Sequence, residues 1–184
     1  VGYKHEIIID EIKNSKFSPY VNFSIEKKLL GTGGAIIQSL NFIENEHFLV
    51  QNGDTYIPIK LDSLLKSFKK NWEKTLFIAV VAGSNKQRYK LLSINKDGMI
   101  THFQKRINYK GINSGLYILN KSMFLNSNYV KKKILSFEDT ILNDLIIRNE
   151  CAGDFFETPF IDIGVPVDYY KANDVLRGNK KETT

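Results

Sequence analysis

The sequence has little cysteine and no long hydrophobic run. Cys151 is its one cysteine, so the chain can form no internal disulfide and no zinc site built from cysteines. No apolar run approaches the roughly 20 residues that a membrane helix needs. No secretory signal opens the chain, and nothing in it requires an oxidising compartment. We therefore expect a soluble, cytoplasmic protein with no membrane partner.

Arginine is also scarce, because only four of the 26 basic residues are Arg. Specific nucleic-acid readers are richer in Arg and cluster their basic residues on one face. The basic runs here, at residues 131–133 and 180–181, are expected to be solvated lysines. We therefore expect no nucleic-acid partner, whereas the net charge of +6 favours a small anionic substrate such as a phosphate ester.

Patterns for nucleophilic catalysis are missing as well. The three histidines, His5, His47 and His102, have no metal-ligand spacing and no serine or cysteine partner pattern. We expect Cys151 to be a small apolar filler or a surface thiol rather than a nucleophile. The chemistry should therefore not depend on a catalytic triad.

What the chain does contain is an alternation of helical and strand patterns over 184 residues, 42% of them hydrophobic. Its length predicts one domain with a sizeable core. The patterns predict helices over residues 4–16, after an Asp62 cap, after a Ser136 cap and from Pro166. They predict strands over residues 21–25, 47–51, 75–82, 112–119 and 155–163. A hairpin is predicted over residues 89–104. This order predicts an α/β domain with a mostly parallel sheet, which binds ligands beyond the carboxyl ends of its strands.

A glycine-rich segment, Gly31-Thr32-Gly33-Gly34, precedes a predicted short helix at residues 35–37. Glycines there can let the backbone approach a flat or charged ligand, or they can simply form a tight turn. A dinucleotide fingerprint is a third reading, because Asp54 lies 20 residues after Gly34. Against it, Ile36 occupies the place of the third glycine, and five residues separate the predicted strand from the loop.

Two aspartates, Asp54 and Asp162, end apolar strands and lie close to glycines. Because Mg²⁺ binds one or two carboxylates together with phosphate oxygens, the pair fits a magnesium site. The alternative is that each caps a helix or a turn. Lys105 follows another predicted strand and can hold a sugar phosphate, or it can be a solvated loop lysine.

Together these segments resemble the sugar-phosphate nucleotidyltransferases, and the resemblance covers nearly all of the chain. The matching stretches, in order, are residues 26–36 (with Gly-Thr-Gly-Gly-Ala), 51–54 (Gln-Asn-Gly-Asp), 103–105 (Phe-Gln-Lys), 113–117 (Asn-Ser-Gly-Leu-Tyr), 136–139 (Ser-Phe-Glu-Asp) and 160–169. Gln104, Lys90 and Val165 depart from the family pattern, which usually has Glu, Gly and Thr there. The resemblance implies a Rossmann-like, GT-A-like fold with a mixed, mostly parallel sheet flanked by helices.

The resemblance also implies a role for each matching residue. The nucleotide would lie against Glu26, Gly31, Thr32, Gly33, Gly34 and Gly53, and the sugar against Asn113, Gly115 and Glu138. Asp54 and Asp162 would hold Mg²⁺ against the nucleotide phosphates, and Lys105 would hold the sugar 1-phosphate. The sugar phosphate would attack the α-phosphorus and expel pyrophosphate, without a protein nucleophile.

The Gly-Thr-Gly-Gly-Ala form and the short length most resemble members that join GTP to D-glycero-D-manno-heptose 1-phosphate, in cell-surface polysaccharide synthesis. Mannose 1-phosphate, N-acetylmuramate 1-phosphate and another NTP remain alternatives. A nucleotide-sugar sensor without turnover and a Rossmann dehydrogenase are alternatives from other classes. A homodimer is also open.

The family begins with a strand and a Gly-rich loop with Arg, whereas Val1 here resembles the end of the family's second strand. We therefore expect residues 1–184 to form a single nucleotidyltransferase domain that lacks its first β-α-β unit. The start at Val1 rather than Met also suggests that residue 1 is not the native start. From this mapping we expect the 184 residues to be unable to catalyse alone.

Overall fold

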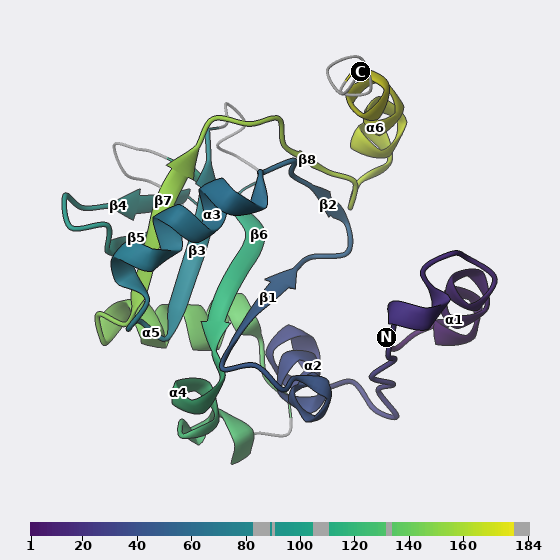
Figure 1. Ribbon diagram of the computed structural model, residues 1–184, viewed down its shortest axis with the longest axis horizontal. Coiled ribbons are helices and arrows are strands. Elements are labelled where there is room, and N and C mark those ends of the chain that lie inside the picture. The colour runs from purple at the N-terminus through teal and green to yellow at the C-terminus, as the bar shows by residue number, and fades with distance from the viewer. Residues whose placement is uncertain (83–88, 90, 105–110, 132–133, 179–184) are drawn as a thin grey trace. The chain divides into compact units, whose positions relative to one another are not determined.

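The computed structural model describes residues 1–82, 89, 91–104, 111–131 and 134–178 (Figure 1). The chain divides into two compact units. The first unit consists of Val1–Phe48 and Asn120–Asp144, and the second of Leu49–Leu119 and Leu145–Thr184.

A mixed sheet forms the core of the second unit, in the strand order β5-β4-β6-β3-β7 with β1 beside β6. The strands are β1 (His47–Gln51), β3 (Leu76–Val81), β4 (Leu91–Ile94), β5 (Ile100–Gln104), β6 (Gly111–Asn120) and β7 (Cys151–Phe156). β3 and β7 run parallel, while β6 pairs antiparallel with both β3 and β4, and β4 pairs antiparallel with β5. The predicted α/β class is therefore confirmed, with a sheet of mixed direction.

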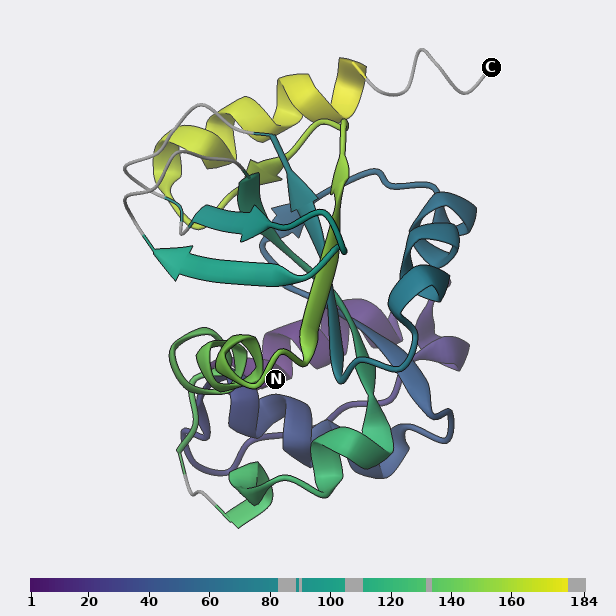
Figure 2. The same cartoon turned by 90° about the vertical axis from the view of Figure 1, so that its left-hand side faces the viewer.

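The strand β3 lies at the centre of this core, because all six of its side chains are buried. Helix α3 (Leu61–Phe68) covers one face of the sheet in both views (Figures 1 and 2). Its buried residues are Leu64 and Phe68, and the Phe68 ring meets Phe77 edge-on at 5.9 Å between centroids. The apolar run at residues 75–82 thus forms the doubly covered strand that the sequence predicts.

The predicted hairpin forms as β4 and β5, and its turn has the expected chemistry. The Asn95 side chain accepts hydrogen bonds from the N–H groups of Asp97 and Met99, at 3.0 and 2.9 Å. Gly98 has φ +78°, which glycine adopts without steric cost. The carbonyl of Gly98 accepts a bond from Gly153 N–H at 2.9 Å, so the hairpin tip covers part of the outer edge of β7.

A short two-stranded ladder, β2 (Thr55–Tyr56) with β8 (Ile161–Asp162), completes the second unit together with α6 (Pro166–Gly178). Helix α6 begins at Pro166, as predicted, since proline suits the first turn of a helix.

The first unit is mostly helical. Its elements are α1 (His5–Lys13), α2 (Gly31–Ser39), α4 (Lys121–Leu125), 3-10 turns at Ser18–Tyr20, Leu40–Phe42 and Asn128–Lys131, and a π-helical turn at Phe137–Leu142. The π-helical turn continues into α5 (Asn143–Ile147), where the chain passes into the second unit at Leu145. A further 3-10 turn, Lys69–Asn71, follows α3 in the second unit. Ser136 caps the π-helical turn, as predicted, because its hydroxyl accepts a bond from Asp139 N–H at 3.1 Å.

Three predicted details are wrong. Residues 21–25 form no strand; instead, the Val1 N-terminus donates to the Ser24 carbonyl at 2.7 Å, and Gln38 Nε2 donates to the Ile25 carbonyl at 3.0 Å. Asp62 does not cap α3, which begins one residue earlier after Lys60. The single strand predicted over residues 155–163 is two strands, β7 and β8, with Pro159 in the gap, where it has no N–H for a ladder.

Candidate functional site

The ladder of β2 and β8 brings the two predicted metal ligands onto neighbouring segments. Thr55 lies opposite Asp162, and Ile163 N–H donates to the Asp54 carbonyl at 2.8 Å. Asp54 lies in the turn before β2, outside the regular ladder. The direction of its carboxylate is therefore not set by the alternation of side chains along a strand. Residues that are 108 positions apart in the sequence therefore meet within the second unit.

The two carboxylates have different surroundings. Asp54 is exposed, and its carboxylate has no hydrogen-bond or ionic partner in the described part of the chain. Asp162 is half-buried, and its Oδ1 accepts a bond from Gly164 N–H at 2.7 Å. Asp54 also lines a cavity of about 350 Å³ between the β2–β8 ladder and α6, together with Gly53, Thr55 and Tyr169. A carboxylate in a cavity of this size is open to a ligand.

The predicted sugar-binding residues Asn113 and Gly115 lie in a bulge of β6 over residues 113–116, which we call the β6 bulge. Opposite β3, Ile78 pairs with Tyr117 and Val80 with Asn113, so β6 advances four residues while β3 advances two. The Ser114 hydroxyl repairs the interrupted ladder, because it donates to the Ala79 carbonyl at 2.7 Å and accepts from Leu116 N–H at 3.2 Å. Bulges of this kind redirect a strand locally and recur beside active sites.

The Asn113 amide fixes the β6 bulge from both ends. Its Nδ2 donates to the Tyr117 hydroxyl at 2.8 Å, and its Oδ1 accepts from Gly115 N–H at 3.1 Å. One N–H and one lone pair of this amide remain for other partners. Sequence reasoning missed the structural roles of Ser114 and of Asn52, whose N–H donates to the Gly115 carbonyl at 2.9 Å. Asn52 lies inside the Gln-Asn-Gly-Asp motif and Ser114 inside the Asn-Ser-Gly-Leu-Tyr motif, so their positions in these motifs could have indicated a role.

In the first unit, the glycine-rich segment starts helix α2 directly at Gly31 and packs against Leu135. Gly33 and Gly34 N–H groups both donate to the Leu135 carbonyl, at 2.8 and 3.3 Å. Gly31 has φ +74°, and a Cβ there would lie 2.6 Å from the same carbonyl. The close approach of the Leu135 segment therefore favours glycine at positions 31 and 33, and the N–H groups of Gly33 and Gly34 are not available to a phosphate.

Thr32 connects this segment to the predicted residue Glu138. The Thr32 hydroxyl donates to Glu138 Oε2 at 3.2 Å and accepts from Phe137 N–H at 2.8 Å. Glu26 Oε2 accepts from Leu30 N–H at 3.2 Å, so it closes the turn that leads into α2. The first unit thus brings Glu26, the glycine-rich segment and Glu138 together.

Lys105 lies outside the described residues. Cys151 is fully buried in β7, and burial raises the pKa of its thiol well above the usual range. The expectation of an apolar filler is therefore confirmed, since a protonated, inaccessible thiol is no nucleophile.

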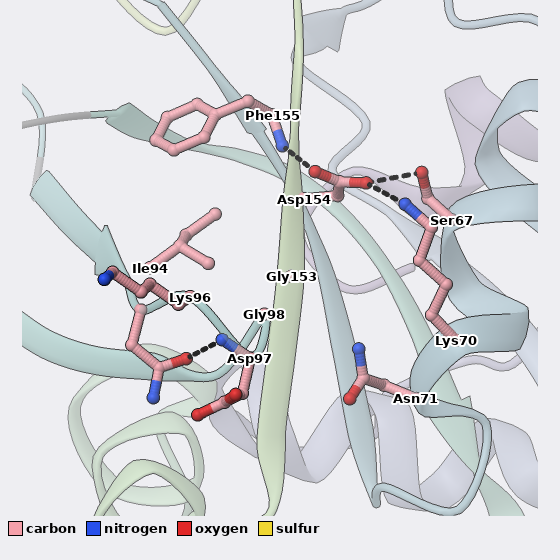
Figure 3. Close-up of a pocket in the computed structure, with 11 residues that line it drawn as sticks. Ser67, Lys70, Asn71, Ile94, Lys96, Asp97, Gly98, Gly153, Asp154 and Phe155 are labelled. Carbon is pink, nitrogen blue, oxygen red and sulfur yellow. Dashed lines mark hydrogen bonds and ion pairs between the residues drawn. The ribbon is translucent and has the colours of Figure 1, made fainter.

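A second cavity, of about 400 Å³, lies in the second unit between α3, the hairpin turn and β7 (Figure 3). Asp154 forms one of its walls, where it accepts bonds from Ser67 Oγ at 2.7 Å and Phe155 N–H at 2.9 Å and faces Lys70 Nζ at 3.4 Å. Partial burial by itself raises the pKa of Asp154, but these bonds and the Lys70 charge outweigh burial, so the pKa lies below its ordinary value.

Within the described residues, no group of three or more His, Cys, Asp or Glu side chains is placed to hold a metal ion. The described helices also include none that is long and apolar enough to cross a membrane. A pair of carboxylates such as Asp54 and Asp162 is a different case, because Mg²⁺ takes its remaining ligands from water and substrate phosphates.

The mixed sheet, the strand-end aspartates and the glycine-rich helix start are the features expected of a nucleotide-dependent transferase. The family model described as nucleotidyl transferase matches residues 2–178, and the chain belongs to that family. The family resemblance predicted from the motifs is confirmed.

Three members of the family are similar to this chain over most of its length. The chain is 34% identical over 172 residues to a D-glycero-alpha-D-manno-heptose 1-phosphate guanylyltransferase of Campylobacter jejuni, covering 92% of this chain and 74% of that protein. It is 33% identical over 180 residues to the same-named protein of Aneurinibacillus thermoaerophilus, covering 96% and 76%. The crystal structure of HddC from Yersinia pseudotuberculosis complexed with GMP-PN matches with a TM-score of 0.79 and 33% identity, over 96% of this chain and 76% of that chain.

Proposed function

We propose that the protein transfers the GMP unit of GTP to D-glycero-D-manno-heptose 1-phosphate, with release of pyrophosphate. The observation that carries this proposal is the similarity to two heptose 1-phosphate guanylyltransferases over at least 92% of the chain. A solved relative of similar identity is complexed with GMP-PN, which supports a guanine nucleotide as the second substrate.

The first unit supplies the surface for the base. Because the N–H groups of Gly33 and Gly34 bond Leu135, the glycine-rich segment offers a close, flat backbone surface rather than a phosphate cradle. A planar guanine suits such a surface. The carboxylates of Glu26 and Glu138 are acceptors for its N–H groups or for sugar hydroxyls.

The second unit supplies the acidic residues for the phosphates. Asp54 and Asp162 would hold Mg²⁺, since hard oxygen ligands from one or two carboxylates suit this ion. Bound there, the ion would neutralise the charge that develops on the phosphates. Asp54 is open to a ligand, and Asp162 is oriented by the bond from Gly164 N–H.

In the reaction, an oxygen of the sugar 1-phosphate forms a bond to the α-phosphorus of GTP. The bond from that phosphorus to the oxygen bridging it to the β-phosphorus breaks, and pyrophosphate leaves. Lys105 would hold the sugar phosphate, and Asn113 and Gly115 would shape the sugar pocket. Positioning and charge neutralisation supply the rate, so no protein nucleophile is needed.

The test is a matrix of NTPs and sugar 1-phosphates with pyrophosphate release as the readout, on the full-length protein. We expect turnover with GTP and the heptose 1-phosphate. Turnover confined to mannose 1-phosphate or to another NTP would reassign the substrates within the family. Tight binding of a nucleotide sugar with no pyrophosphate release under any combination would make the protein a sensor and refute the proposal.

We propose that the reaction takes place in the cytoplasm, because a GTP-dependent enzyme needs access to the GTP pool. Light scattering of the same full-length preparation distinguishes a monomer from a homodimer, and both are open.

A further inference from the structure

The backbone of Asn52 is fixed on both sides. Its N–H donates to the carbonyl of Gly115 in the β6 bulge at 2.9 Å. Its own carbonyl accepts from Thr55 N–H at 3.5 Å and from the Thr55 hydroxyl at 3.2 Å, which closes the turn over residues 52–55 that carries Asp54. Asn52 therefore joins the turn of the proposed metal ligand to the bulge of the proposed sugar pocket, within the second unit.

The Asn52 side chain lies directly over Gly115. A Cβ at Gly115 would come within 2.6 Å of Asn52 Nδ2 and 2.7 Å of its Cγ, closer than real Cβ atoms approach. Gly115 also has φ +75°, a backbone conformation that strains other residues. Because Gly115 has no Cβ, the Asn52 amide can occupy the space above it. Packing against the Gly115 backbone then holds the amide in place.

The amide of Asn52 itself has no hydrogen-bond partner among the described residues, and Asn52 is exposed. An exposed side chain on an anchored backbone, packed against a neighbouring strand, loses little conformational freedom when a ligand binds. It presents two N–H donors and carries no charge. Because the Asn52 backbone connects the turn of Asp54 to the β6 bulge, a ligand that contacts both would pass this amide.

We propose that Asn52 contacts the substrate, with its Nδ2 donating a hydrogen bond to a phosphate oxygen of the sugar 1-phosphate. The inference rests on the proposed function, because Asp54 then faces the nucleotide phosphates and the β6 bulge faces the sugar. The group that connects a sugar to the attacked phosphorus is the sugar's own phosphate, so that anion lies at the junction where Asn52 stands. A neutral donor suits this place, because a second carboxylate beside Asp54 would repel the phosphate.

The experiment compares Asn52→Ala and Asn52→Asp with the wild-type full-length protein. Asn52→Asp keeps the shape of the side chain over Gly115 but replaces the donor by a carboxylate, whereas Asn52→Ala removes both. Neither variant changes the backbone bonds to Gly115 and Thr55. Asn45→Ala, an exposed residue before β1 in the first unit, is the matched control, and thermal unfolding verifies that each variant is folded.

A hydrogen bond to a charged group corresponds to a change of roughly ten- to hundredfold in affinity. We therefore expect Asn52→Ala to raise KM for the sugar 1-phosphate about tenfold or more, with KM for GTP changed less than about threefold. Asn52→Asp should lose more than Asn52→Ala. Calorimetry with the sugar 1-phosphate, in the presence of Mg²⁺ and a non-hydrolysable GTP analogue, should show the same order, and the free sugar should not distinguish the variants.

Two results would overturn the inference. If Asn52→Asp behaves like the wild type, the side chain acts only as a spacer over Gly115. If kcat falls while both KM values and the calorimetric affinities stay the same, Asn52 positions the turn and does not touch the sugar 1-phosphate. The wild-type substrate matrix comes first, so a wrong sugar refutes the heptose assignment alone, and Asn52 is then judged on the sugar 1-phosphate that the wild type binds. If the wild type binds none, both proposals fail.

Discussion

At the scale of single residues, Asp54 and Asp162 are the carboxylates that we propose to hold the metal, and neither belongs to the buried core. Asp54 is exposed, and Oδ1 of the half-buried Asp162 accepts a hydrogen bond from the N–H of the nearby Gly164. Their carboxylates can therefore be neutralised with little effect on folding, in contrast to the buried Ser114 or Thr75.

We predict that Asp54→Asn and Asp162→Asn each lower turnover at least a hundredfold, because under the proposed function each removes a charge that would face the nucleotide phosphates. The melting temperature should stay within about 2 °C of the wild type, as is usual for surface substitutions. Mn²⁺ binding, measured by electron paramagnetic resonance, should weaken in both variants. Asp62→Asn, an exposed carboxylate in the first turn of α3, is the control. Near-normal turnover in both site variants would contradict the metal role.

Asp154 is a different kind of aspartate, because its bonds connect α3 to β7. The lowered pKa means that the folded state binds a proton on Asp154 less readily than the unfolded chain does. The stabilisation is therefore complete above the ordinary pKa of 3.8, and it is lost as the pH falls through the lowered folded value.

We predict that Asp154→Asn lowers the free energy of unfolding by about 1 kcal/mol at pH 7, since a charge-assisted bond is weakened by partial exposure. Urea unfolding at pH 7 and pH 3 measures the effect, and the gap from the wild type should shrink at pH 3. Asp97→Asn, an exposed carboxylate of the same cavity, should show no such gap. An equal gap at both pH values would refute the electrostatic origin.

At the scale of elements, the β6 bulge gives the site its geometry. A regular β6 would pair residue by residue with β3, and its carbonyls would stay in the ladder. The two additional residues instead direct the Gly115 carbonyl to Asn52, and the bulge is held by the side chains of Asn113 and Ser114.

We predict that Ser114→Ala costs about 2 kcal/mol of stability, because it leaves the buried Ala79 carbonyl and Leu116 N–H without their partner. Chemical denaturation measures the loss. KM for the sugar 1-phosphate should rise with it, since the bulge would relax. Ser63→Ala, at an exposed position of α3, is the matched control and should be neutral. A Ser114 variant as stable as this control would show that the hydroxyl does not hold the bulge.

At the scale of the whole molecule, the two units divide the expected substrate contacts. The first unit contains the glycine-rich segment, Glu26 and Glu138, and the second contains Asp54, Asp162 and the β6 bulge. Because Gly33 and Gly34 use their N–H groups on Leu135, the molecule has no free phosphate cradle of the dinucleotide type at this helix start.

We predict that the full-length protein binds GTP in the presence of Mg²⁺ and does not bind NAD. Isothermal calorimetry with GTP, CTP, UTP and NAD measures this directly, and GTP should bind at least tenfold more tightly than the pyrimidine nucleotides. NAD binding without NTP binding would overturn the assignment of the glycine-rich segment to a base.

The sequence predicted the elements whose signals are local. The buried β3, the Asn95 turn with Gly98, the Ser136 cap and the proline start of α6 all follow from neighbours in the chain, and all four form as predicted. The two strand failures have separate causes. The strand predicted over residues 21–25 lacks a ladder partner in the described chain, and Pro159 interrupts the strand predicted over residues 155–163.

For the site, the sequence by itself determined the residue types and their order, and hence the family. It placed Asp54 and Asp162 at strand ends and found the glycines, because those signals depend on spacing alone. Only the tertiary structure decided that Thr55 pairs with Asp162, that Gly31 and Gly33 face Leu135, and that Asn52 lies over Gly115. Such contacts join residues that are tens of positions apart, and their geometry follows from ladder register and close packing, which no local pattern of residues encodes.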